Sequence, residues 1–465
     1  MSAKASKEKT TLIKNALRIA TMDDRGTELE NADILISGAG IVKVGRGIRA
    51  KADKVIDAKG CVVIPGMVNT HHHLYQTLTR NLPAVQDSKL FDWLVYLYEV
   101  WRNLTPDGVY TSAQVGLGEL LLTGCTTSSD HLYLFPGGKS AGLIDTEIEA
   151  AKEIGMRFHP CRGSMSRGRS KGGLPPDDVV QTEDEILKDC ERLIAKYHDR
   201  SKFAMTRIAL APCSPFSVTT ELLKMTAEMA KKLDVRMHTH LAETKDEDDF
   251  CLKMLKMRPL EYMESVGWLE GGRSWFAHCV WLNEKEARLM GKTGTGVAHC
   301  PNSNLRLGSG IAPVRTYLDN NVPVSLAVDG SASADSSDML SEVRAAMLVH
   351  RIKSGVDSMP ARDALRMATR GGARVLGRDD IGSIEPGKAA DLAIFDLNRI
   401  DYAGSVSDPV AAIVFCGASH RARHVLVNGR QVVKDGRLTA VDEGRLVEKA
   451  NKTAKAMYGK LVKLR

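Results

Sequence analysis

The sequence lacks the long apolar segments that membrane spans and secretory leaders require. No run of 18 apolar residues occurs anywhere in the 465 residues, so we expect no transmembrane helix. Residues 1–9 are polar and contain no apolar core, which argues against a signal peptide. Nine cysteines are present, but no two have CxxC spacing. This pattern predicts buried free thiols in a reducing compartment, with the cytoplasm as the expected location.

Aromatic residues are also few, at 5% of the chain, whereas 43% of all residues are apolar. This composition suits a globular enzyme with a well-buried core. The chain is too long for one ordinary domain, but a barrel with a small additional domain would account for its length.

The sequence also has no excess of acidic residues, and its formal net charge is +7. Most of this charge belongs to residues 449–465, which contain six basic residues and no acid: Lys449, Lys452, Lys455, Lys460, Lys463 and Arg465. A basic terminal helix is usually a solvated face or an oligomer contact. We therefore expect no nucleic-acid partner and no membrane partner, and we expect a homodimer or a larger homo-oligomer.

What the sequence does contain is a run of three histidines after a short apolar segment. The stretch Val63-Ile64-Pro65-Gly66-Met67-Val68-Asn69-Thr70-His71-His72-His73 reads as a strand that ends in HxH. Side chains alternate along a strand, so His71 and His73 point to one side and His72 points away. Two imidazoles placed in this way form half of a metal site.

Four later apolar runs also end in histidine or aspartate, and helical segments separate most of them. The runs end at His240, His278, His299 and Asp329. In a (β/α)₈ barrel the catalytic residues lie at the carboxyl ends of the strands. We therefore predict an α/β fold, a distorted (β/α)₈ TIM barrel.

Both ends of the chain predict β structure with no visible catalytic motif. Short alternating strands fill residues 11–44, and the Asn428-Gly429 pair between two apolar runs predicts a hairpin. Each half is too small to form its own core, so we predict one small β-sandwich built from both chain ends. The predicted boundaries are residues 1–64 and 386–440 for the sandwich, 65–385 for the barrel, and 441–465 for the basic helix.

Within the barrel, residues 91–102, 105–123 and 361–376 are predicted helices, and strands are predicted at 124–130, 155–160 and 207–212. Thr105 and Pro106 form a helix start signal. The Gly- and Pro-rich residues 163–182 form a long loop, which is typical of a lid or a substrate loop.

The candidate metal ligands are His71, His73, His240 and Asp329. A catalytic zinc site needs about three protein ligands and an open position for water, and five-coordination is also accessible during catalysis. His238 shares a strand face with His240 but lies one layer deeper, so we interpret it as a core residue.

The chain resembles the amidohydrolase superfamily, and within it the chlorohydrolase and ring-deaminase branch, from about residue 10 to about residue 435. The markers are PGMVNTHHH (65–73), HTHLAET (238–244), AHC (277–279), HCPNSNLRLGSGIAPV (299–314) and VDGSAS (328–333). The resemblance implies one divalent metal ion, with zinc expected and iron as the alternative. Two-metal members use a lysine at the end of the fourth strand, and Ile208–Cys213 contains none, which predicts a mononuclear site.

The resemblance also implies roles for three residues beside the metal. In the HxxE pattern, Glu243 follows His240 and would shuttle a proton to the ring nitrogen and the leaving amine. Asp329 would accept the first proton from the metal-activated water. The AHC match implies that His278 polarises the attacked centre.

Four further stretches bear on the substrate: residues 71–83, 128–136, 161–166 and 211–219. Together they are most similar to 8-oxoguanine deaminases, and next to hydroxytriazine aminohydrolases. The candidate contacts are Gln76, whose amide can both donate and accept, Arg162, Cys213, and Trp93 or Tyr96 as a ring cover. Hydroxy-s-triazines and guanylurea-type amidines remain the alternative small-molecule substrates.

Two other classes fit less well. A cytidine-type zinc deaminase requires HxE and PCxxC, and Pro212-Cys213 is not followed by a second cysteine at that spacing. A metal-free barrel scaffold would have lost ligand residues, whereas every expected position here is filled.

Overall fold

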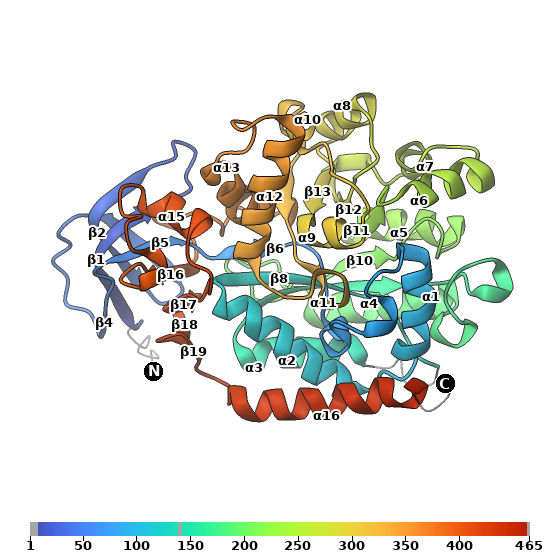
Figure 1. Cartoon of the computed structure of the whole chain (residues 1–465), viewed down its shortest axis with the longest axis horizontal. Helices are drawn as coiled ribbons and strands as arrows, with labels where there is room; N and C mark the ends of the chain where they lie inside the picture. The colour runs from blue at the N-terminus through green and yellow to red at the C-terminus, as the bar shows by residue number, and fades with distance from the viewer. Residues whose placement is uncertain (1–7, 138–141, 463–465) are drawn as a thin grey trace, which may run out of the picture.

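The computed structural model describes residues 8–137 and 142–462. Figure 1 shows two bodies side by side, a β-sandwich domain at the left and a barrel surrounded by helices at the right. Lys463 and Arg465 of the predicted basic helix lie outside the described residues. Across the part that is described, no helix combines the length and apolarity needed to cross a bilayer.

Eight parallel strands form the barrel in chain order, as the sequence predicts. Their main segments are β6 (Met67–Asn69), β8 (Cys125–Leu132), β9 (Arg157–Ser164), β10 (Ala209–Pro212), β11 (Arg236–Leu241), β12 (Ser274–His278), β13 (Gly296–His299) and β14 (Val324–Leu326). The first and last of these do not pair with each other among the described strands. The ring closes instead through β7 (His72–His73) and β15 (Asp329–Gly330), in which Asp329 pairs with His72 and Gly330 with His73.

Helices surround the barrel, and several of them begin at capping residues that can be recognised in the sequence. Thr105 Oγ1 accepts a hydrogen bond from Gly108 N at 3.1 Å, with Pro106 in the first turn. The helices up to the sixth strand are α1 (Leu90–Trp101), α2 (Pro106–Leu122), α3 (Leu143–Ile154), α4 (Glu183–Tyr197), α5 (Thr220–Leu233), α6 (Lys245–Phe250) and α7 (Pro259–Ser265). The later ones are α8 (Glu284–Thr293), α9 (Pro301–Arg306), α10 (Val314–Asp319), α11 (Ser331–Ala334), α12 (Met339–Ser354), α13 (Ala361–Arg366) and α14 (Gly372–Val375).

The predicted helix over 361–376 is interrupted at the seam of the barrel. Between α13 and α14, residues 367–371 form a turn of π-helix. A Cβ atom would lie 2.3 Å from the Val324 carbonyl oxygen at Gly371, and 2.6 Å from that of Val68 at Gly372. The two glycines therefore let this segment lie directly against β6 and β14, the first and last barrel strands.

The β-sandwich domain combines strands from both chain ends. The N-terminal strands are β1 (Thr10–Ala20), β2 (Glu28–Ser37), β3 (Gly40–Gly45), β4 (Lys54–Asp57) and β5 (Cys61–Pro65). The C-terminal strands are β16 (Leu392–Asp396), β17 (His424–Val427), β18 (Arg430–Lys434) and β19 (Arg437–Leu438). β5 pairs with β16, which joins the two halves. Asn428 and Gly429 both have positive φ and connect β17 to β18, so the predicted hairpin is confirmed.

Two helices complete the chain. α15 (Pro409–Phe415) lies on the sandwich, and α16 (Glu443–Val462) crosses to the barrel and runs along α2 (Figure 1). Lys449 of α16 forms an ion pair with Asp107 of α2 at 2.7 Å. α16 also contacts α1 and the 3₁₀ segment η1 (Leu74–Thr79) that follows the histidine run.

A buried ion pair connects the barrel to the sandwich. The guanidinium of Arg157, at the start of β9, donates to both carboxylate oxygens of Asp391 at 3.0 and 3.1 Å. Both side chains are almost fully buried, with 0% and 2% exposure. Arg157 also donates to the Phe203 and Ala204 carbonyls, and Asp391 accepts from the main chain of Asn428.

We expect Asp391→Ala to lower the free energy of unfolding by about 3–5 kcal/mol, because it leaves the Arg157 charge buried without a counter-charge. Asp184→Ala is the matched control, since its pair with Lys188 is about three-quarters exposed and should contribute less than about 1 kcal/mol. Urea denaturation followed by circular dichroism measures both. Equal, small effects of the two substitutions would contradict this prediction.

Candidate metal centre and active site

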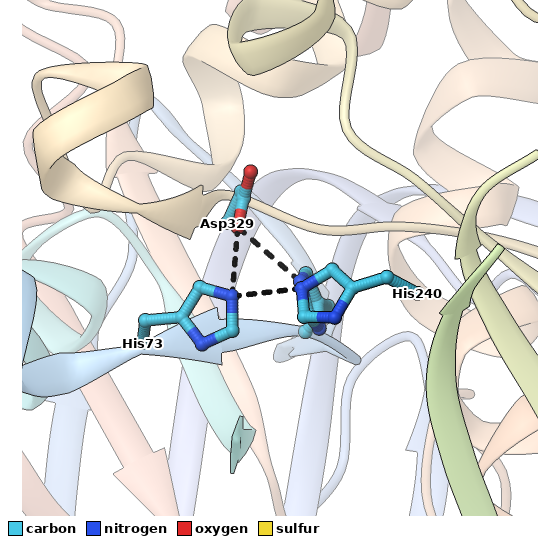
Figure 2. A group of neighbouring side chains, drawn as sticks. His73, His240 and Asp329 are labelled. Carbon is cyan, nitrogen blue, oxygen red and sulfur yellow. Dashed lines mark hydrogen bonds and ion pairs between the residues drawn. The ribbon is translucent and has the colours of Figure 1, made fainter. Parts of the chain in front are cut away.

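Four side chains from three parts of the barrel converge where its strands end. Each offers one ligand atom, and the four atoms, from His71, His73, His240 and Asp329, all lie within 4.8 Å of one another. Asp329 Oδ1 is 3.2 Å from His71 Nε2 and 3.3 Å from His73 Nε2. The Nε2 atoms of His73 and His240 are 3.1 Å apart. Figure 2 shows His73, His240 and Asp329 pointing toward a common centre.

Hydrogen bonds fix the tautomers of two of these histidines. His73 Nδ1 lies 2.8 Å from the His131 carbonyl oxygen, and His240 Nδ1 lies 2.6 Å from that of Cys213. A carbonyl oxygen only accepts, so Nδ1 must carry the proton in both rings. Each Nε2 therefore presents its lone pair to the common centre, which is how metal-binding histidines are usually oriented.

A chain of two hydrogen bonds also fixes the tautomer of His71. The Trp275 carbonyl oxygen lies 2.9 Å from His238 Nδ1, which must therefore donate. His238 Nε2 is then an acceptor, and His71 Nδ1 donates to it at 2.7 Å. His71 Nε2 is left buried with a free lone pair and no hydrogen-bond partner in the described structure. His238 is a core residue, as expected, but it also orients a candidate ligand.

His71, His131 and His238 form a second group whose candidate ligand atoms lie within 4.8 Å of one another. His238 uses both of its nitrogens in hydrogen bonds, so it has no lone pair left for a metal, and His131 Nε2 bonds to the Ala211 carbonyl oxygen at 2.8 Å. The first cluster is therefore the better candidate metal site.

The ionisation of the four residues suits a divalent cation. Burial lowers the pKa of His71 well below its ordinary value and that of His240 to about 3, so both rings are neutral at neutral pH. Burial disfavours the carboxylate of Asp329, but the adjacent His71 ring and the imidazoles of His278 and His73 hold its pKa well below the usual range. Neutral imidazoles with one carboxylate are a donor set that fits zinc.

The second oxygen of Asp329 is held by hydroxyl groups rather than by histidines. Ser303 Oγ donates to Asp329 Oδ2 at 2.6 Å, and Ser333 Oγ donates at 3.2 Å. Both serines lie in the sequence stretches after their strands, on α9 and α11. Oδ1 consequently remains directed at His71 and His73.

Glu243 and His278 lie beside this centre. Glu243 Oε2 is 3.6 Å from His278 Nε2, and the same nitrogen is 3.9 Å from Asp329 Oδ2. His278 Nδ1 donates to Asn304 Oδ1 at 2.9 Å, and Ser309 Oγ donates to Glu243 Oε1 at 3.3 Å. Burial raises the pKa of Glu243. Two carboxyl groups and an imidazole in contact can hold and transfer protons.

Three residues at the same strand ends have strained backbone conformations. Ala242, His278 and Asp329 have φ angles of 52°, 70° and 60°, in the left-handed region that non-glycine residues rarely adopt. Each such residue costs about 1–3 kcal/mol, and such strain concentrates at functional sites.

A cavity extends from the centre toward α1. It is lined by His73, His240, Glu243, His278 and Asp329, and by Gln76, Leu90, Trp93, Leu94, Tyr98, Tyr133, Cys213, Ser214, Phe216, Glu247, Leu307 and Ser333. Gln76 Oε1 and Trp93 Nε1 are buried and have no hydrogen-bond partner within the described ranges. The structure thus brings three of the predicted substrate residues, Gln76, Trp93 and Cys213, to the cavity.

Arg162 does not line this cavity. Its guanidinium is fully buried and forms an ion pair with Asp189 of α4 at 2.7 Å. It also donates to Gln181 Oε1 at 2.8 Å and lies over the Phe135 ring. These partners hold the side chain away from the centre, so the structure does not support Arg162 as a substrate contact. Tyr96 is likewise absent from the cavity wall.

The loop of residues 163–182 does not line the cavity either. It supports the helix that does, because Asp178 pairs with Arg102 at 2.6 Å and Arg169 pairs with Glu99 at 2.8 Å, both next to or within α1. α1 supplies Leu90, Trp93, Leu94 and Tyr98 to the cavity. The loop therefore stabilises α1, which forms part of the cavity wall.

Sequence reasoning missed Glu247 on α6. It is 1% exposed and lines the cavity, and its Oε2 accepts a hydrogen bond from Glu243 N at 3.2 Å. Burial raises the pKa of Glu247 to about 8, so the group is mostly neutral at pH 7. Glu247 belongs to the acidic run Asp246–Asp249. The one sequence signal that distinguishes it from its neighbours is its position four residues after Glu243, a spacing close to one helical turn.

We expect His240→Gln and Asp329→Ala to lose bound metal, because each removes one of the four converging ligand atoms. His299→Gln is the matched control, since His299 is a buried histidine at the end of the next-but-one strand and bonds to His350. Metal analysis of the purified variants checks this. Full metal occupancy in either ligand variant would remove that residue from the ligand set.

Comparison with known proteins agrees with this geometry. Residues 62–432 match the Amidohydrolase family. The chain is 46% identical to an 8-oxoguanine deaminase of Pseudomonas aeruginosa over 449 residues, which are 96% of this chain and 99% of that relative. It is 34% identical to a hydroxydechloroatrazine ethylaminohydrolase of Pseudomonas sp. (strain ADP), with 95% and 94% covered.

A solved structure of a related protein has the same fold. The zinc complex of atrazine chlorohydrolase from Arthrobacter aurescens TC1 aligns with a TM-score of 0.92 at 37% identity, over 96% of this chain and 100% of that chain. The family match covers most of the sequence, and the named relatives align along nearly their whole lengths. The chain therefore belongs to the amidohydrolase family and is a hydrolase of that family.

Proposed function

We propose that this chain is a metal-dependent aminohydrolase that hydrolytically deaminates a flat, nitrogen-rich ring, with 8-oxoguanine as its substrate. The observation that supports this most directly is the meeting of Glu243, His278 and Asp329 on the wall of a cavity that Gln76 and Trp93 also line. Proton-transfer groups and ring-binding groups thus face the same space. The 46% identity to an 8-oxoguanine deaminase supports the choice of ring.

We propose a single divalent ion, held by His71, His73, His240 and Asp329. Zinc is the preferred ion, because the donor set suits it and the aligned atrazine chlorohydrolase was solved with zinc. No lysine occurs at the end of β10, where Pro212 and Cys213 stand, which favours one ion over two. A divalent ion bound there would act as a Lewis acid and lower the pKa of water.

The protein groups then have distinct tasks. Deamination requires addition of water to an sp² carbon, protonation of a ring nitrogen and departure of ammonia. Asp329 is placed to accept the proton that the attacking water loses. Glu243 is placed to give its proton to the ring nitrogen, because its raised pKa makes the protonated form accessible. It would then take up the proton that the added hydroxyl group loses as the carbonyl forms, and give it to the leaving amine. His278 faces both carboxylates and would stabilise charge developing at the attacked carbon.

Substrate binding is assigned to other residues of the same cavity wall. Trp93, Leu94 and Phe216 offer apolar surface to a planar ring. The free Oε1 of Gln76 can accept from a ring N–H, and the free Nε1–H of Trp93 can donate to a carbonyl oxygen. The mostly neutral Glu247 adds a second donor. 8-Oxoguanine offers both a carbonyl oxygen and ring N–H groups to such a wall.

A hydroxy-s-triazine is the second candidate substrate. It is also flat and rich in nitrogen, and this chain aligns closely with the atrazine chlorohydrolase and the hydroxydechloroatrazine ethylaminohydrolase. Ammonia or amine release across a panel of 8-oxoguanine, isoxanthopterin, hydroxytriazines and guanylurea separates the candidates. Much faster turnover of a hydroxytriazine or of guanylurea than of any oxopurine would contradict the substrate while leaving the reaction class intact.

We expect Glu243→Gln to retain metal but to lower kcat at least about a hundredfold, the scale of general acid–base catalysis. Glu247→Gln is the matched control on the same cavity wall. A neutral amide replaces a group that is already mostly neutral at pH 7, so its kcat should stay within about tenfold of the parent. Steady-state kinetics with 8-oxoguanine measure both, and a Glu243→Gln enzyme as active as the Glu247→Gln enzyme would require another proton carrier.

We expect Gln76→Ala to lower kcat/KM for 8-oxoguanine about ten- to a hundredfold without loss of metal, because a buried hydrogen bond of about 1–3 kcal/mol disappears. Gln114→Ala provides the comparison, since Gln114 is a buried glutamine of α2 that bonds to Tyr110 and does not line the cavity. If both substitutions have the same effect on kcat/KM, Gln76 does not bind the substrate.

A further inference from the structure

A second cavity lies at the opposite end of the barrel, where the strands begin. It has a volume of about 280 Å³ and is bounded by the first residues of β10 and β11, by Trp275 near the start of β12, and by Gly377 after α14. The metal ligands stand at the carboxyl ends of the strands, so this cavity is separate from the candidate active site. We call it the basic cavity, after the side chains Arg200, Arg207 and Arg236 on its wall.

None of these three arginines forms an ion pair among the described residues, whereas most other buried or half-buried arginines do. Arg207 donates only to backbone carbonyls, those of Asp199, Arg200, Ser201 and Gly377, at 3.2–3.5 Å. Arg200 donates to the Leu233 carbonyl. Arg207 and Arg236 are partly buried, and Arg200 lies at the exposed rim. A partly buried guanidinium without an ion-pair partner is unfavourable, so the grouping of the three arginines favours an anion.

Arg236 is the most deeply placed of the three. One terminal nitrogen donates to the Gly272 carbonyl at 3.0 Å, while its buried Nε has no partner in the described part of the chain. Burial, together with the charge of Arg273, lowers the pKa of Arg236 to about 10. The guanidinium nevertheless stays charged at neutral pH.

Two histidines also line the same wall, and one of them adds a donor. Arg378 donates to His159 Nε2 at 3.1 Å, and an arginine cannot accept, so the proton of His159 must be on Nδ1. This N–H makes no hydrogen bond to a described residue. His198 Nδ1 lies 3.1 Å from the Ile208 nitrogen and 3.2 Å from the Ile208 carbonyl oxygen, so either tautomer of His198 satisfies its contacts.

Few carboxylates lie close to this wall, and none of the described ones forms an ion pair with its three arginines; Asp199, Asp379 and Asp380 act on Arg207 only through longer-range charge interactions. Asp234 is the one acid on the cavity wall, and it lies at the exposed rim, 3.4 Å from Arg273. Behind the wall, Asp380 is paired with Arg378 and Asp391 with Arg157. The residues that the structure does not describe, 1–7, 138–141 and 463–465, include no aspartate or glutamate.

We propose that the basic cavity binds a phosphate-type oxyanion. A tetrahedral dianion presents only acceptors, and the wall presents three guanidinium groups and the Nδ1–H of His159 as donors. Arginine is the side chain best suited to paired hydrogen bonds with phosphate oxygens. The volume also leaves room for a small organic group attached to the phosphate. This inference does not depend on the proposed substrate.

The test is isothermal titration of the purified, metal-loaded protein with inorganic phosphate, in a buffer free of other oxyanions and with ionic strength held constant by chloride. We expect saturable binding near one equivalent. Arg236→Gln and Arg207→Gln should each weaken it at least tenfold. Arg288→Gln, which removes the same charge from an exposed pair with Glu284 on α8, should leave it unchanged.

The variants also separate this cavity from the metal centre, which could itself attract phosphate. Binding that persists unchanged in Arg236→Gln and Arg207→Gln, or no saturable binding to the parent protein, would overturn the proposal. If either buried substitution prevents folding, Arg200→Gln at the exposed rim and Arg207→Lys test the same wall, with at least a threefold loss expected. A parallel titration with ribose 5-phosphate distinguishes the source of the oxyanion, because tighter binding than that of phosphate identifies a phosphomonoester.

Discussion

The short pairing of β7 with β15 is the interaction on which both the barrel and its site depend. It joins His72 to Asp329 and His73 to Gly330, and the Asp329 N–H donates to the His71 carbonyl oxygen at 3.2 Å. The backbone that closes the ring thus also sets the spacing of ligands from the first and last strands. Asp329 adopts a left-handed φ to make this contact, and Gly371 and Gly372 let the last helical segment press against the seam. A substitution that opened the seam would disperse the metal ligands and loosen the fold together.

Much of this arrangement could be predicted from the sequence, because its determinants are local. Alternation along a strand places His71 and His73 together, and strands of a parallel barrel all end at one face, so His240, His278 and Asp329 follow by position alone. The family resemblance rests on the same strand-end motifs and is confirmed by the family match. The β-sandwich shared by the two chain ends was predictable from the short strands and from the Asn428-Gly429 turn.

Features that depend on distant partners could not be predicted in this way. Arg162 lies near the carboxyl end of β9, but the direction of its side chain is decided by Asp189 on α4, which no local pattern links to it. Residues 163–182 have the composition of a lid, yet ion pairs formed by their acidic and basic side chains connect them to α1. Glu247 has the sequence of an exposed helical acid, and only the packing of α6 against the cavity buries it. His238 gains its role from the neighbouring β12 carbonyl rather than from its own motif.

The bracing of α1 has a consequence for access to the centre. The pairs Arg102–Asp178 and Arg169–Glu99 hold this helix in place, and their side chains are between 30% and 51% exposed. Mobile ions screen partly exposed charges within about 8–10 Å at physiological ionic strength, whereas the buried pair of Arg157 and Asp391 is shielded from them. Concentrated salt should therefore loosen the α1 wall of the cavity before it weakens the scaffold, so that ligand exchange becomes faster in a protein whose overall stability has scarcely changed.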